Sequence, residues 1–307
     1  MMRKFIVLVI VLFAGFCWAQ ENKSSQITGY IKSKKLDEAS GLVASRIHKN
    51  VLYSHNDSGD VARIFALKTD GMILAQYLLK DVKVRDVEEI AIGPGPVKGI
   101  NYIFLADIGD NNAVHDNISV YRFPEPNVPS EPDESADARA KKQVDKLHLI
   151  EKFDTLKFIF PDGKRDAETM FVDPLNKDIW IVSKREKKSR VYVSRYPQLI
   201  KEINKLEFIT ELPFNFATAG DINSDGSIVL IKNYVLLARY DRQQGKSLDQ
   251  AFKADPQYIS IMPEPQGESV CFSADGKYYY TISEFIEKFH KKTGVPVYRF
   301  GLMDSKK

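Results

Sequence analysis

Cysteine is scarce in this chain, which contains two cysteines among 307 residues. Cys17 lies in an N-terminal apolar segment, so removal of that segment would leave Cys271 without an intramolecular partner. A small module held together by disulfides is therefore excluded, and the fold must rest on a large core of its own. Cys271 lies between Val270 and Phe272, which is the setting of a small buried hydrophobic residue.

The chain also lacks long basic runs, and Arg3 and Lys4 supply two of the positive charges behind a formal net charge of only +3. A nucleic-acid polymer is therefore not expected as a partner. Several familiar catalytic patterns are missing as well. The sequence has no nucleophile elbow, phosphate-binding glycine loop, zinc-spaced histidine pair or Cys–His arrangement. These absences direct the search for a site towards carboxylate and hydroxyl oxygens.

The N-terminus has the pattern of an export signal. Arg3 and Lys4 form a basic start, and residues 5–16 form an apolar run. This run is too short to cross a hydrocarbon core of roughly 30 Å as a helix. Cys17 and Ala19 are small residues at the positions that signal peptidase requires, so cleavage is expected after Ala19.

Lipoprotein processing at Cys17 is the alternative, although the residue before it, Phe16, is bulky. No apolar stretch beyond position 20 is long enough to span a membrane as a helix. We therefore expect a secreted or periplasmic protein with a signal peptide at 1–19 and a single domain at 20–307.

A five-fold internal repeat predicts the architecture of that domain. Each unit opens with a short stretch of similar pattern, and the openings lie at 38–42, 86–90, 166–170, 216–220 and 266–270. An apolar strand follows each opening, at 51–54, 102–106, 179–182, 228–231 and 278–282. These strands are rich in β-branched and aromatic residues and are bounded by turn residues, so we expect them to be buried.

The outer strands repeat too. The tetrapeptide Val-Tyr-Arg-Phe occurs at 120–123 and again at 297–300, and looser versions lie at 64–67, 191–194 and 237–240. A fourth strand follows in the first four units, at 73–79, 156–160, 206–212 and 258–261. The fifth unit lacks a fourth strand, and a spare strand at 26–32 predicts that the N-terminus joins the last unit and closes a ring.

Four antiparallel strands per unit, repeated radially, are typical of a propeller, which protects its sheet edges in this way. We therefore predict an all-β, five-bladed β-propeller. The second unit is longer because of a polar stretch at 125–143, which we interpret as an insertion with a short helix at 135–143. A six-bladed propeller is the alternative, but it would need two more apolar strands, and this stretch has none.

Equivalent positions on the inner strands of a propeller face one another across its axis. The third position of each opening carries an oxygen-bearing side chain, namely Ser40, Glu88, Glu168, Thr218 and Glu268. Three carboxylates at such short range would raise one another's pKa unless a cation neutralised them. Oxygen ligands without His or Cys suit a hard ion, and a wide, irregular ring suits Ca²⁺. The alternative is that these side chains solvate a water-filled channel.

The order Ser, Glu, Glu, Ser/Thr, Glu on five successive inner strands resembles that of calcium-activated nucleotidases, the soluble apyrases. Ser40, Glu88, Glu168, Thr218 and Glu268 match that pattern position by position, with Thr in place of Ser in the fourth unit. The resemblance implies a five-bladed propeller with a central Ca²⁺. The loops beyond the ring diverge from the nucleotidase sequence, so the resemblance implies the metal site more directly than the nucleotidase activity.

The second strand of each unit ends on the same face as this ring and delivers further candidates. Our candidate bases are His55, Asp57 and Asp107, and our candidate substrate-binding residues are Lys184, Arg185, Lys232 and Glu284. A purely structural role is the alternative for several of them. The pattern Asp-x-Gly-Asp at 57–60 and 107–110 is also that of an ordinary hairpin turn, and Lys184 and Arg185 begin a charged run that could form a solvated hairpin tip.

These features predict an exported, calcium-dependent hydrolase that acts on a phosphoester, nucleotide or lactone. Its ligand is expected to be a small anionic or polyol molecule, and we expect a monomer. Propeller lactonases and phytases, which also hold Ca²⁺ on the axis, keep the reaction class open. The alternative function is a non-catalytic binding propeller, in which Ca²⁺ is a structural pin and the loops grip a glycan or protein.

Overall fold

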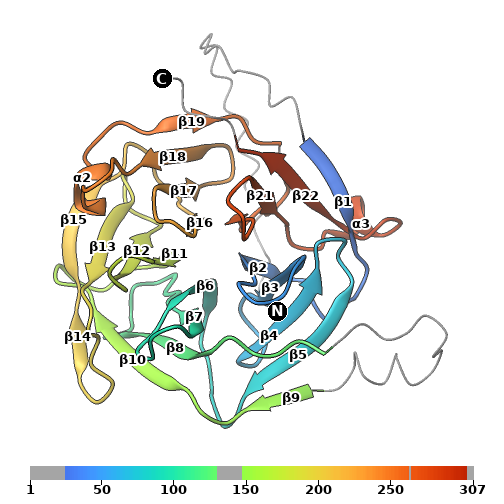
Figure 1. The fold of residues 1–307 in the computed structure, drawn as a ribbon, viewed down its shortest axis with the longest axis horizontal. Helices are drawn as coiled ribbons and strands as arrows, with labels where there is room; N and C mark the ends of the chain where they lie inside the picture. The colour runs from blue at the N-terminus through green and yellow to red at the C-terminus, as the bar shows by residue number, and fades with distance from the viewer. Residues whose placement is uncertain (1–24, 130–146, 263, 303–307) are drawn as a thin grey trace.

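The computed structural model describes residues 25–129, 147–262 and 264–302, and its strands form five sheets arranged around one axis (Figure 1). The all-β, five-bladed propeller is therefore confirmed, and the described residues contain no sixth sheet. Among the described residues, helix is limited to the single turns α2 (Leu248–Ala251) and α3 (Glu287–His290). In this part of the chain, no helix is long and apolar enough to cross a membrane.

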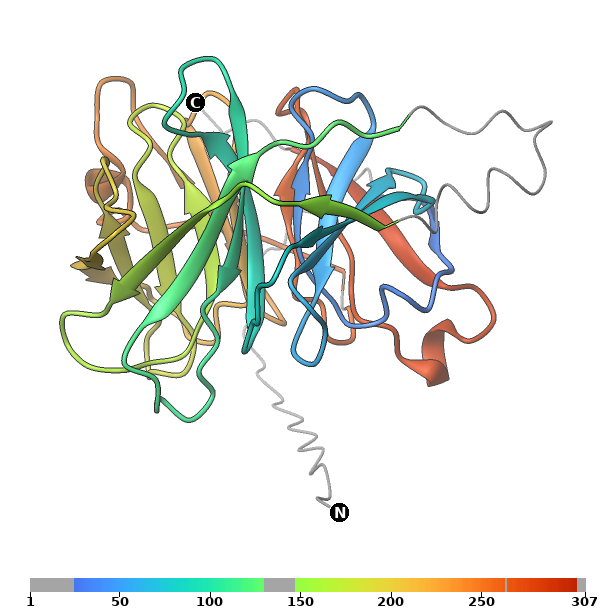
Figure 2. The ribbon, with the colours of Figure 1, turned by 90° about the horizontal axis from the view of Figure 1, so that it is seen from below.

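Each blade runs outward from an inner strand at the axis, and Figure 2 shows the blades edge-on. Blade one contains β2 (Ala39–Ala44), β3 (Val51–Asn56), β4 (Arg63–Lys68), β5 (Ile73–Leu79) and β9 (Leu147–Ile150). Blade two contains β6 (Val87–Pro94), β7 (Asn101–Asp107), β8 (Ile118–Pro124), β10 (Asp154–Ile159) and β14 (Ile203–Lys205).

The remaining blades have four strands each. Blade three contains β11 (Ala167–Val172), β12 (Ile179–Ser183), β13 (Arg190–Ser194) and β15 (Glu207–Glu211). Blade four contains β16 (Ala219–Ile222), β17 (Ile228–Lys232), β18 (Leu237–Asp241) and β19 (Gln257–Ile259). Blade five contains β20 (Cys271–Phe272), β21 (Tyr278–Thr281), β22 (Val295–Gly301) and β1 (Ser25–Ile31).

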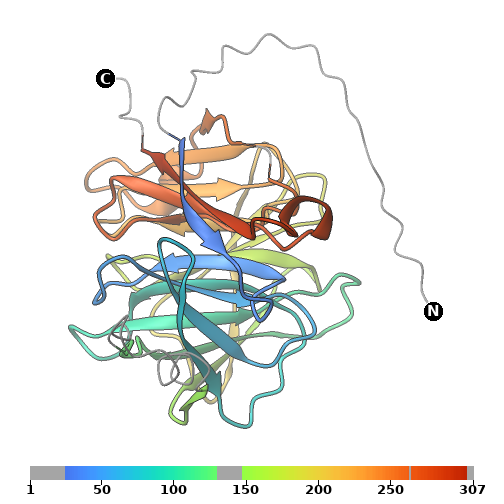
Figure 3. The same cartoon turned by 90° about the vertical axis from the view of Figure 1, so that its right-hand side faces the viewer.

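The ring closes as the repeat predicts. Strand β1 pairs antiparallel with β22, from Ser25 opposite Phe300 to Ile31 opposite Val295. Figure 3 shows this first strand beside the strands of the last blade. Each inner strand also lies against the inner strands of the two neighbouring blades, so the five form a closed inner wall.

Two outer strands were not predicted. Strand β9 adds in parallel to the edge of blade one, and β14 adds in parallel to the edge of blade two. Each lies in the connection between the third and fourth strands of the following blade, so the outer edges of blades one and two are covered by the chain of the next blade. The start of the predicted insertion packs on blade one in the same way, because the Tyr77 hydroxyl donates to the Asn127 carbonyl oxygen at 2.6 Å. The predicted signal peptide and the predicted helix at 135–143 lie outside the described residues.

The core consists of apolar layers between successive blades. Aromatic side chains fill these layers, as where the Phe171 and Trp180 rings stack with centroids 6.2 Å apart. Each such fully buried side chain stabilises the fold by about 1.5–3 kcal/mol relative to exposure. Cys271 is a buried free thiol within one of these layers, as predicted.

Two buried carboxylates cross-link the inner wall, and we call Glu89 and Asp221 the channel belt. One Glu89 oxygen accepts the Gly220 N–H at 3.1 Å, which joins β6 to β16. One Asp221 oxygen accepts the Phe272 N–H at 2.8 Å, which joins β16 to β20. Glycine makes room for the belt at Gly41, where a Cβ would lie 2.8 Å from a Glu89 oxygen and φ is +55°. The belt therefore holds three blades together with buried hydrogen bonds from carboxyl oxygens to backbone N–H groups.

Candidate functional site

The positions of two predicted ring residues are set by β-bulges. Strand pairing shifts by one residue at Glu88 in blade two and at Glu168 in blade three. A bulge changes the direction in which a side chain points. By the same pairing, the equivalent residue of blade one is Gly41, and the neighbouring Ser40 hydroxyl donates to the Glu88 carbonyl oxygen at 3.0 Å. At the position where blades two and three present Glu88 and Glu168, blade one therefore contributes a hydrogen bond from Ser40 to the neighbouring inner strand.

Seven carboxylates gather where the inner strands begin and the second strands end, and we call them the acidic pit. They form three overlapping groups, and within each group one oxygen per residue lies within 4.8 Å of the others. The groups are Asp57–Glu268–Glu284, Asp57–Asp86–Glu88 and Glu88–Asp166–Glu168. Glu88, Glu168 and Glu268 were predicted as metal ligands, Asp57 as a base and Glu284 as a substrate-binding residue.

Asp86 and Asp166 were missed as members of this cluster. Both lie two residues before a ring glutamate, so the pattern Asp-x-Glu repeats in blades two and three. That repeated pair of carboxylates could have indicated from the sequence that Asp86 and Asp166 belong to the cluster. In the structure, Asp166 accepts the Asp110 N–H at 2.8 Å and pairs with the Arg185 guanidinium at 2.6 Å, and both contacts fix its position.

Burial and mutual repulsion raise the pKa of five carboxyls of the pit, namely Asp57, Asp86, Glu88, Glu168 and Glu284. Glu88 and Glu168 are only 3% and 4% exposed. Burial, followed by the nearby charge of Glu168, raises the pKa of Glu88 well above its usual range. Burial, followed by the charge of Glu268, raises the pKa of Asp57 and of Glu284 to about 7. The ionised pit is therefore unstable by itself, and a cation would stabilise it.

Three oxygens around the pit are buried and have no hydrogen-bond partner among the described residues. They are Glu168 Oε2, Asp57 Oδ1 and Thr218 Oγ1. An unsatisfied buried acceptor costs about 1–3 kcal/mol, and more when it is charged. An all-oxygen donor set of this kind fits a hard cation, and the number of carboxylates fits the six to eight oxygen ligands that Ca²⁺ takes. The residues present are therefore compatible with a calcium centre.

Lys184 and Tyr234 lie against one side of the pit. The Lys184 ammonium donates to a Glu168 oxygen, and it lies 3.9 Å from Glu268 Oε1 and 3.3 Å from the Tyr234 hydroxyl oxygen. The Tyr234 hydroxyl donates to Glu268. Lys184 was predicted as a substrate-binding residue, whereas Tyr234 was missed, although it lies in the turn between β17 and β18, two residues after the predicted Lys232.

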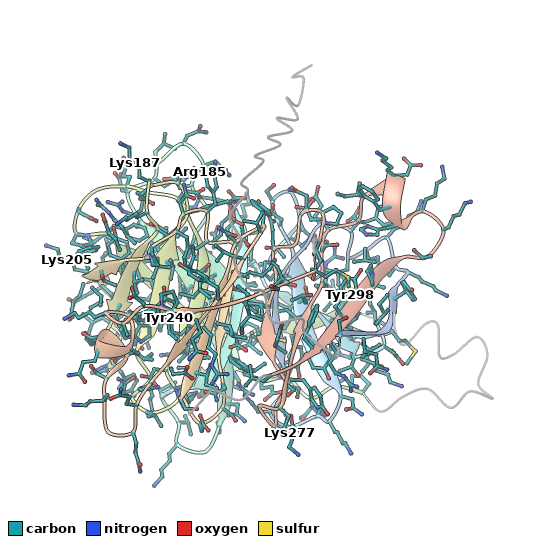
Figure 4. All side chains as sticks on the ribbon, turned by 90° about the horizontal axis from the view of Figure 1, so that it is seen from above. Arg185, Lys187, Lys205, Tyr240, Lys277 and Tyr298 are labelled. Carbon is teal, nitrogen blue, oxygen red and sulfur yellow. The ribbon has the colours of Figure 1, made fainter. Side chains whose placement is uncertain are left out.

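Arg185 lies at the rim. Its side chain is 43% exposed, pairs with Asp166 and donates to the Asn111 side chain. Figure 4 shows Arg185 and Lys187 close together at one face of the propeller. A positive rim beside the pit is suited to an anionic ligand.

Three other predicted site residues lie outside the acidic pit. The Asp107 carboxylate accepts the N–H groups of Arg85 and Asp86 at 3.0 and 2.9 Å, and so holds the start of β6. His55 is buried beside Gly41, and burial lowers its pKa to about 4, so the ring is neutral at neutral pH. Lys232 is fully buried, and its ammonium donates to the Gly267 carbonyl oxygen.

The turn interpretation accounts for the second aspartate of each Asp-x-Gly-Asp pattern. Asp60 accepts two hydrogen bonds from the Arg63 guanidinium, at 2.9 and 2.7 Å. Asp110 accepts the N–H groups of Val114 and His115 at 2.9 and 2.8 Å. Both carboxylates shape their loops instead of joining the pit.

Comparison with known proteins adds little beyond the fold. No family model matches the chain, and no curated protein matches it. A gluconolactonase from Xanthomonas campestris aligns with a TM-score of 0.45 at 10% identity, over 82% of this chain and 69% of that one. A chain of the nidogen–laminin complex aligns with a TM-score of 0.42 at 13% identity, over 80% and 72%. Likeness at this level carries no argument about activity.

Proposed function

We propose that this protein is an exported, calcium-dependent hydrolase acting on a phosphoester, nucleotide or lactone. The observation that carries the proposal is the buried and unpartnered Glu168 Oε2 within a group of seven carboxylates. Such a cluster is costly to keep ionised without a bound cation. A metal-dependent hydrolytic centre would explain why the protein keeps this unfavourable cluster.

The cation would be held chiefly by Glu88, Asp166 and Glu168, with Asp86 from the adjoining group. The predicted ring residues Ser40, Thr218 and Glu268 complete the list of candidate ligands. When bound, Ca²⁺ would neutralise the carboxylates and polarise a substrate oxygen.

The chain's own side chains would supply the proton transfer and the binding of charge. Asp57 has a pKa raised to about 7, so its carboxylate can take a proton from an attacking water near neutral pH. Lys184 and Arg185 lie at the pit and its rim and would bind the negative charge of the substrate. His55, Asp107 and Lys232 would support the fold instead.

The channel belt argues against the alternative of Ca²⁺ as a purely structural pin. Glu89 and Asp221 already join the inner strands of blades two, four and five without a metal. A second cross-link at the pit would add little to the cohesion of the ring. The open oxygens of Glu168 and Asp57 are therefore better explained by a ligand that takes part in function.

The proposal is tested with the variants Glu88→Gln and Glu168→Gln, and with Glu202→Gln as a matched control at an exposed position. The substrates are an aryl phosphate ester, a nucleoside diphosphate and a sugar lactone, each assayed in chelator and after Ca²⁺ is restored. We expect hydrolysis of at least one substrate to stop in chelator, and each pit variant to lose about a hundredfold in kcat/KM. Unchanged hydrolysis in both variants would rule out the metal-dependent enzyme, and unfolding in chelator, followed by circular dichroism, would favour the structural pin.

A further inference from the structure

The acidic pit already contains one cation of the chain's own. Lys184 is 5% exposed, and its ammonium contacts Glu168, Glu268 and Tyr234. Lys184 is therefore a bound ammonium ion inside the pit.

This ammonium and a metal ion would need the same oxygens. Glu168 belongs to the group Glu88–Asp166–Glu168, and Glu268 belongs to the group Asp57–Glu268–Glu284, so Lys184 touches both ends of the pit. The ammonium contacts Glu168 and lies 3.9 Å from Glu268 Oε1, so it already neutralises part of their charge. A divalent cation bound to the same oxygens would carry twice the charge of the ammonium and would repel it at this range.

We propose that Lys184 is an internal competitor for the metal site, which a bound divalent cation displaces from Glu168 and Glu268. This inference rests on the proposed function, since it assumes that the pit binds a metal. The backbone of Lys184 is held by its N–H bond to the Asp166 carbonyl oxygen at 3.0 Å, so the displaced ammonium stays at the pit. It then becomes available to an anionic group of the substrate. Metal binding and anion binding are in this way coupled through one side chain.

The coupling makes Lys184 a positioning and specificity residue, and its removal should change the affinities for metal and for anion in opposite directions. Its loss should strengthen metal binding while weakening anion binding, whereas a merely structural lysine would weaken both or neither. A matched control lies on the same loop, because Lys187 is exposed and its removal changes the net charge by the same amount. Figure 4 shows Lys187 near Arg185, at the rim.

The experiment measures Ca²⁺ affinity by titration calorimetry for the full-length wild type, Lys184→Met and Lys187→Met, each with and without inorganic sulfate. We expect Lys184→Met to bind Ca²⁺ at least about tenfold more tightly than wild type, and Lys187→Met to change affinity by less than about twofold, because exposed charges are screened. Sulfate should raise the Ca²⁺ affinity of the wild type and of Lys187→Met, but not that of Lys184→Met. Equal or weaker Ca²⁺ binding by folded Lys184→Met overturns the inference.

A second measurement uses the wild-type protein and guards against misfolding of the variant. Amine acylation followed by mass spectrometry should leave Lys184 unmodified in chelator and modify it once Ca²⁺ is saturating, with Lys187 modified in both states. Protection of Lys184 that persists in Ca²⁺ overturns the inference while leaving the metal site intact. If neither the wild type nor either variant binds Ca²⁺, the proposed function and this inference are overturned together.

Discussion

Glu88 and Glu89 are adjacent on β6 and are both buried, yet they belong to opposite kinds of site. Glu89, in the channel belt, accepts the N–H groups of Gly220 and Ile90, each at 3.1 Å. Glu88, in the acidic pit, has the charges of Glu168 and Asp57 as its nearest influences. Burial alone therefore does not tell a structural carboxylate from a functional one. Burial raises the pKa of both carboxyls well above the usual range. The backbone donors of Gly220 and Ile90 oppose this rise at Glu89, whereas the charges of Glu168 and Asp57 add to it at Glu88, so the difference lies in the partners.

The largest expected effect is on the belt. Glu89→Gln places an amide N–H₂ against the backbone donor of Gly220 or of Ile90, so one of these donors loses its acceptor. We expect a loss of about 3 kcal/mol in the free energy of unfolding. Chemical denaturation monitored by tyrosine and tryptophan fluorescence measures it. A loss below about 1 kcal/mol would mean that the belt does not cross-link the blades.

The neighbouring substitution should act in the opposite direction. Glu88→Gln removes one of several repelling carboxylates, so the metal-free protein should be as stable as the wild type or more so. Its Ca²⁺ affinity should fall about thirtyfold, or ~2 kcal/mol. Denaturation in chelator and calorimetric titration measure the two effects. Parallel losses of stability in Glu88→Gln and Glu89→Gln would remove the distinction between pit and belt.

The repulsion among the pit carboxylates should also make the stability of the metal-free protein depend on pH. Asp57 and Glu284 have pKa values raised to about 7 in the folded protein, above the value near 4 expected for unfolded carboxyls. Between these values the folded state holds protons that the unfolded state has released, so stability falls as pH rises through this window. In chelator, Tm should drop by about 4 °C or more between pH 5 and pH 8. Saturating Ca²⁺ should reduce or reverse the drop in thermal scans, and a flat Tm in chelator would contradict the repulsion within the pit.

The smallest effect is expected at Asp107. Its carboxylate accepts backbone N–H groups, and an asparagine can keep one oxygen in that place. Asp107→Asn should therefore retain kcat/KM within about threefold. The comparison is Asp57→Asn, which removes the proposed base and should lose far more under the same assay. A similar loss in both variants would return Asp107 to the list of catalytic candidates.

The blades could be predicted because their signal is periodic. Apolar, β-branched strands recur after similar openings, and the spare strand at the N-terminus has only one vacant place to occupy. The added strands β9 and β14 could not be predicted in this way. They are short, they are partly exposed, and they pair with the edge of a neighbouring blade, so neither apolarity nor the repeat marks them.

The site was harder to predict because it depends on single-residue shifts. A β-bulge leaves no trace in the apolar pattern, yet it decides that Glu88 enters the pit whereas Glu89 enters the belt. His55 and Asp107 were expected at the site because they end strand two, but each is directed to other partners. Tyr234 lies in the turn after β17, where the search for charged and acidic side chains passed over an aromatic residue.

The pairing of β1 with β22 has a consequence for how the molecule is assembled. These strands come from opposite ends of the described chain, and the first one synthesised completes the last blade. The ring therefore cannot close until β22 has been synthesised, and before then β1 has no strand to pair with. The same arrangement means that the ring does not depend on which blade comes first along the chain. Joining the two ends and opening the chain between two other blades should produce a permuted protein with the same ring.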